Sequence, residues 1–162
     1  MTSKRRFGCD LLCTERAFWS VNGVLAGSWA LLMLVGCASG TITGQDQTCR
    51  SSGGLYAVEE ISCTGSVVSV RGSPNLAIVE ADEELDGSYR FDATIAVAKG
   101  TARASVTAAD GEQIGGEVTP ETPLQITAVI EPGDEEEIDV ALKVAGNEVG
   151  DLCYEATLVR QD

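Results

Sequence analysis

Histidine is absent from this sequence, and only 11 of its 162 residues are lysine or arginine, against 25 aspartates and glutamates. Without histidine, the chain has no Ser-His or Cys-His pair for nucleophilic catalysis and no histidine ligand for zinc. A formal net charge of -14 also repels the phosphate backbone of nucleic acids. The sequence therefore predicts neither histidine-based catalysis nor a nucleic-acid partner.

The short motifs of several other enzyme classes are missing as well. The sequence has no GxxxxGK phosphate loop, no Asp-Thr-Gly or Asp-Ser-Gly triplet and no Ser-x-x-Lys. It also has no CxxC pair, so we expect no metal site. We predict no catalytic residue and no cofactor. A hydrolase that uses a pair of carboxylates stays open as a third alternative, because acidic side chains are plentiful.

The first 36 residues differ from the rest of the chain. They carry four basic and two acidic residues, whereas residues 37–162 carry 7 basic and 23 acidic residues. No charged residue occurs from 17 to 45, and the densest apolar run is 24–35. Basic residues, then an apolar run, then small residues are the order typical of a secretory signal peptide.

The apolar run ends in Leu34-Val35-Gly36-Cys37, and Ala38 follows. This segment resembles the lipobox of bacterial lipoproteins, in which an aliphatic residue, a small or aliphatic residue and Gly or Ala precede a cysteine. The resemblance implies a diacylglyceryl group with palmitate-type chains on the Cys37 sulfur, and cleavage between Gly36 and Cys37 by signal peptidase II. Two acyl chains hold a protein stably at a membrane. We therefore expect 1–36 to be a lipoprotein signal peptide, and Cys37 to anchor the protein outside the cytoplasm, at a bacterial cell membrane or outer membrane.

An uncleaved signal anchor is the alternative interpretation of this segment. Residues 17–35 approach the length that crosses a bilayer, although Ser20, Asn22 and Ser28 lower their hydrophobicity. Arg5-Arg6 is similar to a twin-arginine export signal, but the residues around the pair fit that pattern poorly.

The segment after the leader is small and polar. Residues 38–54 are rich in Gly, Ser and Thr, a composition typical of flexible linkers. We therefore expect 37–54 to be a flexible tether and 55–162 to be the folded domain.

The expected domain alternates apolar and polar residues with a period of two, which is typical of strands with one buried face. The segments with this pattern are 88–97, 101–107, 124–130, 138–144 and 152–158, with shorter candidates at 67–70 and 76–79. Turn residues lie between them, including Asp86-Gly87, Lys99-Gly100, Pro132-Gly133-Asp134 and Gly146-Asn147. Seven or eight strands without a helical period predict an all-β fold, a single antiparallel β-sandwich of jelly-roll or immunoglobulin-like type.

The layout of 87–159 is similar to that of jelly-roll carbohydrate-binding modules. It has a Tyr-led strand, a Gly-separated partner strand, a Pro-Gly-acidic hairpin and a final aromatic strand. The resemblance implies a glycan ligand but supplies no binding residue to carry over. Sugars commonly stack on exposed aromatic side chains, and the alternation puts Tyr89, Phe91 and Tyr154 on buried faces. Tyr56 is the aromatic residue that we expect to be exposed.

Four cysteines remain after the expected cleavage: Cys37, Cys49, Cys63 and Cys153. An exported protein can form disulfides, and with Cys37 lipidated one pair can form among the other three. Cys49–Cys63 closes the shortest loop, whereas Cys63–Cys153 joins the first and last strands of the expected sandwich. The sequence does not choose between these pairings.

Two segments of the expected domain are rich in acidic residues. Asp82-Glu83-Glu84-Leu85-Asp86-Gly87 resembles the start of a calcium-binding EF-hand loop, but Ala93 stands where that loop needs a bidentate glutamate. We interpret it as a solvated acidic turn, with a calcium site of another type as the alternative. Glu135-Glu136-Glu137 follows a Pro-Gly turn and is interpreted as exposed charge that protects a sheet edge.

Together these patterns predict a membrane-anchored extracytoplasmic lipoprotein that presents one acidic β-sandwich. We expect a non-catalytic role as an interaction, ligand-binding or envelope-structural module, with a protein or glycan of the envelope as its partner. A jelly-roll carbohydrate-binding module is the alternative function.

Overall fold

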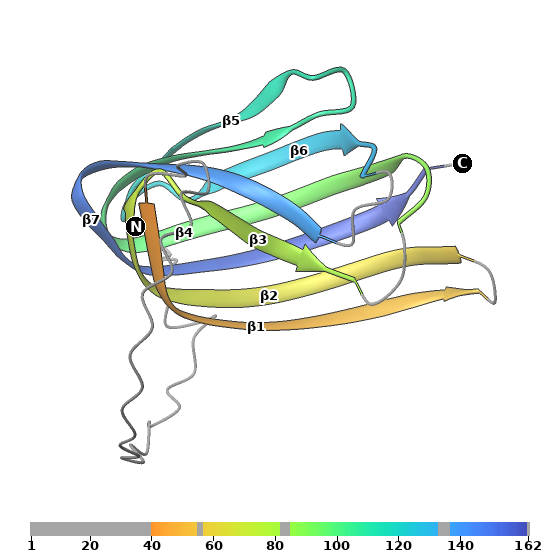
Figure 1. Cartoon of the computed structure of the whole chain (residues 1–162), viewed down its shortest axis with the longest axis horizontal. Coiled ribbons are helices and arrows are strands. Elements are labelled where there is room, and N and C mark those ends of the chain that lie inside the picture. The colour runs from red at the N-terminus through yellow and green to blue at the C-terminus, as the bar shows by residue number, and fades with distance from the viewer. Residues whose placement is uncertain (1–39, 55–56, 82–84, 133–136, 162) are drawn as a thin grey trace, which may run out of the picture.

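The computed structural model describes residues 40–54, 57–81, 85–132 and 137–161, and in these residues it contains seven strands and no helix (Figure 1). The strands are β1 (Gly40–Gly54), β2 (Ala57–Gly72), β3 (Asn75–Glu80), β4 (Tyr89–Thr107), β5 (Gln113–Val118), β6 (Leu124–Ile130) and β7 (Glu137–Arg160). Every pair of neighbouring strands is antiparallel. The described residues include no helix long and apolar enough to cross a membrane.

Two long strands, β4 and β7, organise the molecule. The first half of β4 pairs with β6 and with the second half of β7, while its second half pairs with β5 and with the first half of β7. The hydrogen-bonded sheet therefore folds over into two layers, visible one behind the other in Figure 1. The large layer runs β1-β2-β7-β4-β6, and the small layer runs β3-β7-β4-β5. This arrangement confirms the predicted all-β antiparallel sandwich.

The core lies between the layers and consists of the apolar residues that the alternation singled out. Phe91, Ile95 and Val97 of β4 are at most 3% exposed, and the intervening polar residues point outward. Tyr89, Phe91 and Tyr154 are at most 1% exposed, as their positions in the pattern predicted. Every buried side-chain nitrogen or oxygen of the described residues has a hydrogen-bond partner. The pattern of period two was therefore a correct guide to the core.

The two expected turns at Lys99-Gly100 and Gly146-Asn147 are wrong. Each lies inside a continuous strand, at the place where β4 or β7 bends from one layer into the other. Gly100 has a φ of 81°, and a Cβ atom on it would lie 2.5 Å from the carbonyl oxygen of Glu148. Glycine supplies the positive φ for a bend as well as for a turn, so the local sequence did not distinguish the two.

The expected tether is also wrong where the structure describes it, because Gly40–Gly54 form β1. This strand pairs with β2 along its whole length, from Gly40 opposite Gly72 to Gly54 opposite Ala57. It is an edge strand whose polar side chains are mostly exposed, while Ile42 and Cys49 pack against the core. Polar edge strands resemble linkers in composition, which explains the error. The folded domain therefore includes Gly40–Gly54, and residues 37–39 lie outside the described part.

The strand β5 was not predicted. Its sequence, QIGGEV, contains two glycines that interrupt the alternation. Gly115 lies where a Cβ atom would be 2.0 Å from the carbonyl oxygen of Ala104 in β4, so a close approach of two backbones requires glycine there.

The sandwich has two distinct ends. The bend end contains the bends of β4 and β7 together with Gly40, which pairs with Gly72. The open end contains the first residue of β4, Tyr89, which lies opposite both Ile130 and Arg160. In Figure 1 the bend end is on the left and the open end on the right. The first described residue and the last strand end thus lie at opposite ends of the molecule.

Candidate functional site: the end cleft

A cleft of about 420 Å³ opens at the open end of the sandwich. Three chain segments form this end cleft: 106–109, where β4 ends, 130–132, where β6 ends, and 138–139, where β7 begins. Binding sites for small ligands typically have volumes of ~300–1,000 Å³. The end cleft therefore has the size of a small binding site or of a pocket for one or two side chains.

The floor of the cleft is apolar. Val106, Ile130 and Ile138 line it and are at most 5% exposed, and Pro132 is half-buried beside them. Val106, Ile130 and Ile138 belong to the core, and each is paired with a residue of a neighbouring strand, so the floor is part of the rigid framework. An apolar floor favours a ligand that can bury an apolar group.

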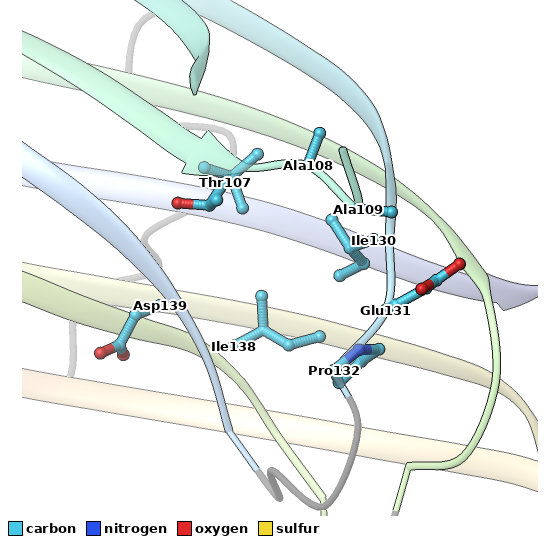
Figure 2. A pocket seen from close by; sticks show the side chains of 9 residues that line it. Thr107, Ala108, Ala109, Ile130, Glu131, Pro132, Ile138 and Asp139 are labelled. Carbon is cyan, nitrogen blue, oxygen red and sulfur yellow. The ribbon is translucent and has the colours of Figure 1, made fainter. Parts of the chain in front are cut away.

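The rim of the cleft carries negative charge. Glu131 and Asp139 line it and are exposed, and in the view of Figure 2 Ile138 lies between them. Glu137 starts β7 opposite Glu80 of β3. Partial burial, together with the charges of Asp139 and Glu80, raises the pKa of Glu137 above its usual value. The part of this rise that comes from Asp139 and Glu80 reflects repulsion between neighbouring carboxylates, which a cationic ligand would reduce.

A tight turn shapes the third side of the cleft. Gly111 N–H donates to Ala108 O at 2.9 Å, and Asp110 accepts from the Glu112 N–H at 2.9 Å. Ala109 N–H donates to Val129 O of β6, also at 2.9 Å. Because this turn is bonded to β6, the exposed Ala109 side chain keeps a fixed place at the edge of the cleft.

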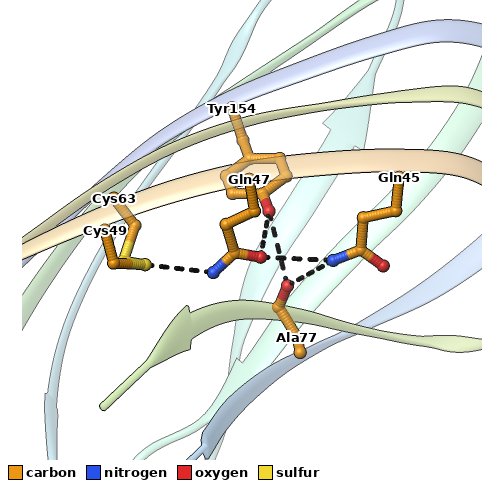
Figure 3. Close-up of a disulfide and its surroundings, with 6 residues drawn as sticks. All are labelled: Gln45, Gln47, Cys49, Cys63, Ala77 and Tyr154. Atoms are coloured by element: carbon orange, nitrogen blue, oxygen red, sulfur yellow. Dashed lines mark hydrogen bonds between the residues drawn. A yellow bond between two sulfur atoms is a disulfide. The ribbon is translucent and has the colours of Figure 1, made fainter. Parts of the chain in front are cut away.

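A polar network joins the two layers at the edge between β1 and β3 (Figure 3). The Tyr154 hydroxyl donates to Gln47 Oε1 at 2.7 Å, and Gln45 Nε2 donates to Ala77 O at 3.1 Å. Gln47 Nε2 in turn lies 3.1 Å from Cys49 Sγ. Burial of the ring raises the pKa of Tyr154 to about 12. This network has a structural role, because it ties the edge strand β1 to the small layer.

The structure decides between the two disulfide pairings that the sequence left open. Cys49 and Cys63 form a disulfide between directly opposed residues of β1 and β2, with 4.1 Å between their Cα atoms. Cys63 is buried in the core. Cys153 of β7 lies opposite Ser66 of β2 on one side and Ala96 of β4 on the other. Because Ser66 is three residues beyond Cys63 in β2, Cys153 does not face Cys63. Cys153 is 2% exposed and takes no part in this bond.

The other residues singled out by sequence fall apart from the end cleft or outside the described residues. Cys37, Gly36, Tyr56 and Glu135-Glu136 lie outside them, as do residues 82–84 of the acidic segment 82–87. Ala93, the twelfth position of the EF-hand-like segment, is 5% exposed and belongs to the core. Within the described part of the chain, no group of three or more acidic or cysteine side chains is arranged to hold a metal ion.

The sequence did not predict the end cleft, because its lining comes from three separated segments. The Pro-Gly pair at 132–133 marked a turn there, but nothing in that motif indicates an apolar floor behind it.

The outer face of the large layer is the second surface with organised polar groups. Residues in register across the five strands form rows that are mostly hydroxyl and carboxyl side chains. One row contains Thr48, Thr64, Glu155, Thr94 and Gln125, and the next contains Arg50, Ser62, Thr157, Asp92 and Thr127. The Thr127 hydroxyl donates to Asp92 at 2.7 Å, and this bond, followed by the nearby Arg90, lowers the pKa of Asp92 despite some burial. No aromatic side chain of the described residues lies on this face, since all three are in the core.

Comparison with known proteins gives weak similarities only. No protein-family model matches the sequence, and no curated protein matches it. Procruciferin, an 11S globulin from Brassica napus, shares 12% identity over 63% of this chain and 21% of its own, with a TM-score of 0.31. The chain therefore spans about a fifth of the length of that globulin.

Two binding domains are similar to a comparable degree. The CBM22-1 xylan-binding domain from Paenibacillus barcinonensis Xyn10C shares 10% identity over 76% of this chain and 87% of its own, with a TM-score of 0.32. The N-terminal cellulose-binding domain of β-1,4-glucanase C from Cellulomonas fimi shares 16% identity over 77% of this chain and 96% of its own, with a TM-score of 0.30. At these TM-scores the likeness carries no argument about a ligand, and the assignment of the fold rests on the strand pairing of this chain.

Proposed function

We propose that this protein is a lipid-anchored, extracytoplasmic binding module without catalytic activity, and that the end cleft is its ligand site. The observation that carries the proposal is the cleft itself, with its apolar floor and its two rim carboxylates. A cleft that combines apolar side chains with a few fixed polar groups is a usual form of a small-molecule binding site.

Two features support a place outside the cytoplasm. The lipobox-like segment Leu34-Val35-Gly36-Cys37 ends three positions before Gly40, the first residue of β1. The disulfide between Cys49 and Cys63 persists in oxidising compartments and is uncommon in the cytoplasm. Export followed by lipidation accounts for both features with one targeting route.

The anchor is tested by intact mass and membrane fractionation of the expressed protein. We expect the wild type to begin at Cys37, to carry acyl mass and to fractionate with membranes. Cys37→Ala should abolish the acyl mass, whereas Cys13→Ala, a cysteine of the leader, should leave the mature mass unchanged. A full-length membrane species that Cys37→Ala does not affect would overturn the lipoprotein proposal and favour a signal anchor.

Glycan binding on the outer face of the large layer is a second candidate function. The observation that favours it is the register of hydroxyl groups across five strands, which offers donors and acceptors to a polysaccharide chain. Affinity electrophoresis in gels that contain xylan or mixed-linkage β-glucan tests it. We expect Thr94→Val to reduce retardation and Thr101→Val, on the small layer, to leave it unchanged. Equal retardation with and without polysaccharide for the wild type would exclude these glycans as ligands.

A further inference from the structure

The position of the end cleft relative to the anchor determines where a ligand must come from. Gly40 is three residues after Cys37 and lies at the bend end, whereas the cleft lies at the open end. β4 alone runs from Tyr89 at the open end to Lys99 at the bend end, which is about 33 Å at ~3.3 Å per residue. A protein anchored through Cys37 therefore holds the cleft tens of ångströms from the lipid surface if the sandwich stands upright.

The charges of the described residues are distributed unequally between the two ends. The bend half contains four basic residues, Arg71, Lys99, Arg103 and Lys143, and five acidic residues, Asp46, Glu117, Glu121, Glu148 and Asp151. The open half contains three basic residues, Arg50, Arg90 and Arg160, and eleven acidic residues, Glu59, Glu60, Glu80, Asp86, Asp92, Asp110, Glu112, Glu131, Glu137, Asp139 and Glu155. The bend half is therefore nearly neutral, while the described open half has a net charge of -8.

This unequal distribution of charge disfavours contact between the open end and a membrane. Anionic lipids give a bilayer a negative surface potential, which repels an acidic surface within about one Debye length. The nearly neutral bend end, which is joined to the anchor, meets no such repulsion. The upright orientation is therefore favoured over one in which the cleft touches its own membrane.

From this geometry we infer that the end cleft faces away from the anchoring membrane and takes a basic peptide segment that inserts one apolar side chain between Glu131 and Asp139. The inference rests on the proposed lipid anchor and ligand site. Charge complementarity selects a cationic partner, the apolar floor selects an aliphatic or aromatic side chain, and the distance from the membrane selects a partner that arrives from outside.

Peptide binding to the mature lipidated protein, residues 37–162, in vesicles tests the partner. The probes are two fluorescent pentapeptides, Lys-Lys-Leu-Lys-Lys and Lys-Lys-Gly-Lys-Lys, measured by fluorescence anisotropy. We expect the leucine peptide to bind about tenfold more tightly than the glycine peptide, because its side chain leaves water. Binding of both should weaken when salt is raised from about 0.05 M to about 0.5 M.

Matched variants separate the cleft from the general charge of the protein. Ala109→Trp should fill the cleft and abolish the preference for leucine, whereas Ala145→Trp, exposed at the bend end, should retain it. Glu131→Gln should weaken the binding of both peptides more than Glu117→Gln, which removes the same charge at the bend end. Absence of peptide binding, equal affinity for the two peptides, or equal effects of the two Trp variants would overturn the inferred partner.

Energy transfer to a labelled lipid tests the orientation and distinguishes it from the anchor. A fluorophore is attached at Ser73→Cys, exposed at the bend end, or at Glu112→Cys, exposed at the open end; Cys153 is buried and should not react. We expect strong transfer from position 73 and weak transfer from position 112. Equal transfer from both would overturn the upright orientation while leaving the anchor intact. No transfer from either position would overturn the anchor itself.

Discussion

Replacing Gly65 by alanine should destabilise the sandwich strongly, because the ring of Tyr154 occupies the place of the missing side chain. A Cβ atom on Gly65 would lie 2.3 Å from Tyr154 Cζ and 2.4 Å from the hydroxyl oxygen. The ring is 1% exposed, and its hydroxyl is fixed by the hydrogen bond to Gln47. Neither the new methyl group nor the ring therefore has free space into which to move.

The expected cost combines two effects. Overpacking a well-filled core costs about 1–3 kcal/mol, and displacing the ring loses its hydroxyl bond, worth about 1 kcal/mol. We therefore expect the free energy of unfolding to fall by roughly 2–4 kcal/mol and the midpoint of thermal unfolding to fall by about 10 °C. Denaturation in urea, followed by circular dichroism, measures the first quantity directly.

Gly150→Ala is the matched control for this prediction. Gly150 lies in β7, and the nearest side-chain atoms to an added Cβ, those of Lys99, are 3.6 Å away. We expect this variant to change the free energy of unfolding by less than about 0.5 kcal/mol. In the double variant with Tyr154→Leu, the cost of Gly65→Ala should fall by at least about 1 kcal/mol, because the clashing ring is gone. Equal costs for Gly65→Ala and Gly150→Ala, or additive effects in the double variant, would refute the packing argument.

Three further predictions concern the disulfide and the titratable groups. Replacing Cys49 and Cys63 together by alanine should lower the free energy of unfolding by about 3 kcal/mol, since the bond closes a loop of 14 residues; equal urea midpoints for the variant and the wild type would contradict this. Burial raises the pKa of Tyr154 from 10.0 to about 12, so the unfolded chain loses this proton first and the free energy of unfolding should fall as pH rises between these values. The phenolate absorbance that Tyr154→Phe removes should titrate near 12. A midpoint near 10 would indicate a solvated hydroxyl. Glu137→Gln should raise the free energy of unfolding at pH 7 by roughly 0.3 kcal/mol, because Glu137 faces Glu80 across the strand pair. This gain should disappear at acidic pH, where the Glu137 carboxyl, whose pKa is raised, becomes protonated. A lower free energy of unfolding at pH 7 would show that Glu137 is favourably paired.

The sequence determined those features that depend on the direction of side chains along a strand. Tyr89, Phe91 and Tyr154 were correctly placed in the core, and 124–130 was correctly identified as a strand, because alternation along an extended chain fixes which face each residue occupies. The predicted lipobox is likewise a local pattern, and its test is chemical and independent of the fold.

Three features depend on which distant segments meet, and only the tertiary structure decided them. Gly100 marks a bend and not a turn because β4 continues along β7 after changing layers, and the polar segment 40–54 is a strand because β2 offers it an edge. The end cleft exists because 106–109, 130–132 and 138–139 converge at one end of the sandwich. The unequal distribution of charge between the two halves also depends on the tertiary structure. The sequence shows that the domain is acidic, but pairing of the strands places eleven of the described carboxyl groups in the half that contains the cleft. Local composition records what each segment is made of, whereas a site depends on contacts between residues far apart in the chain.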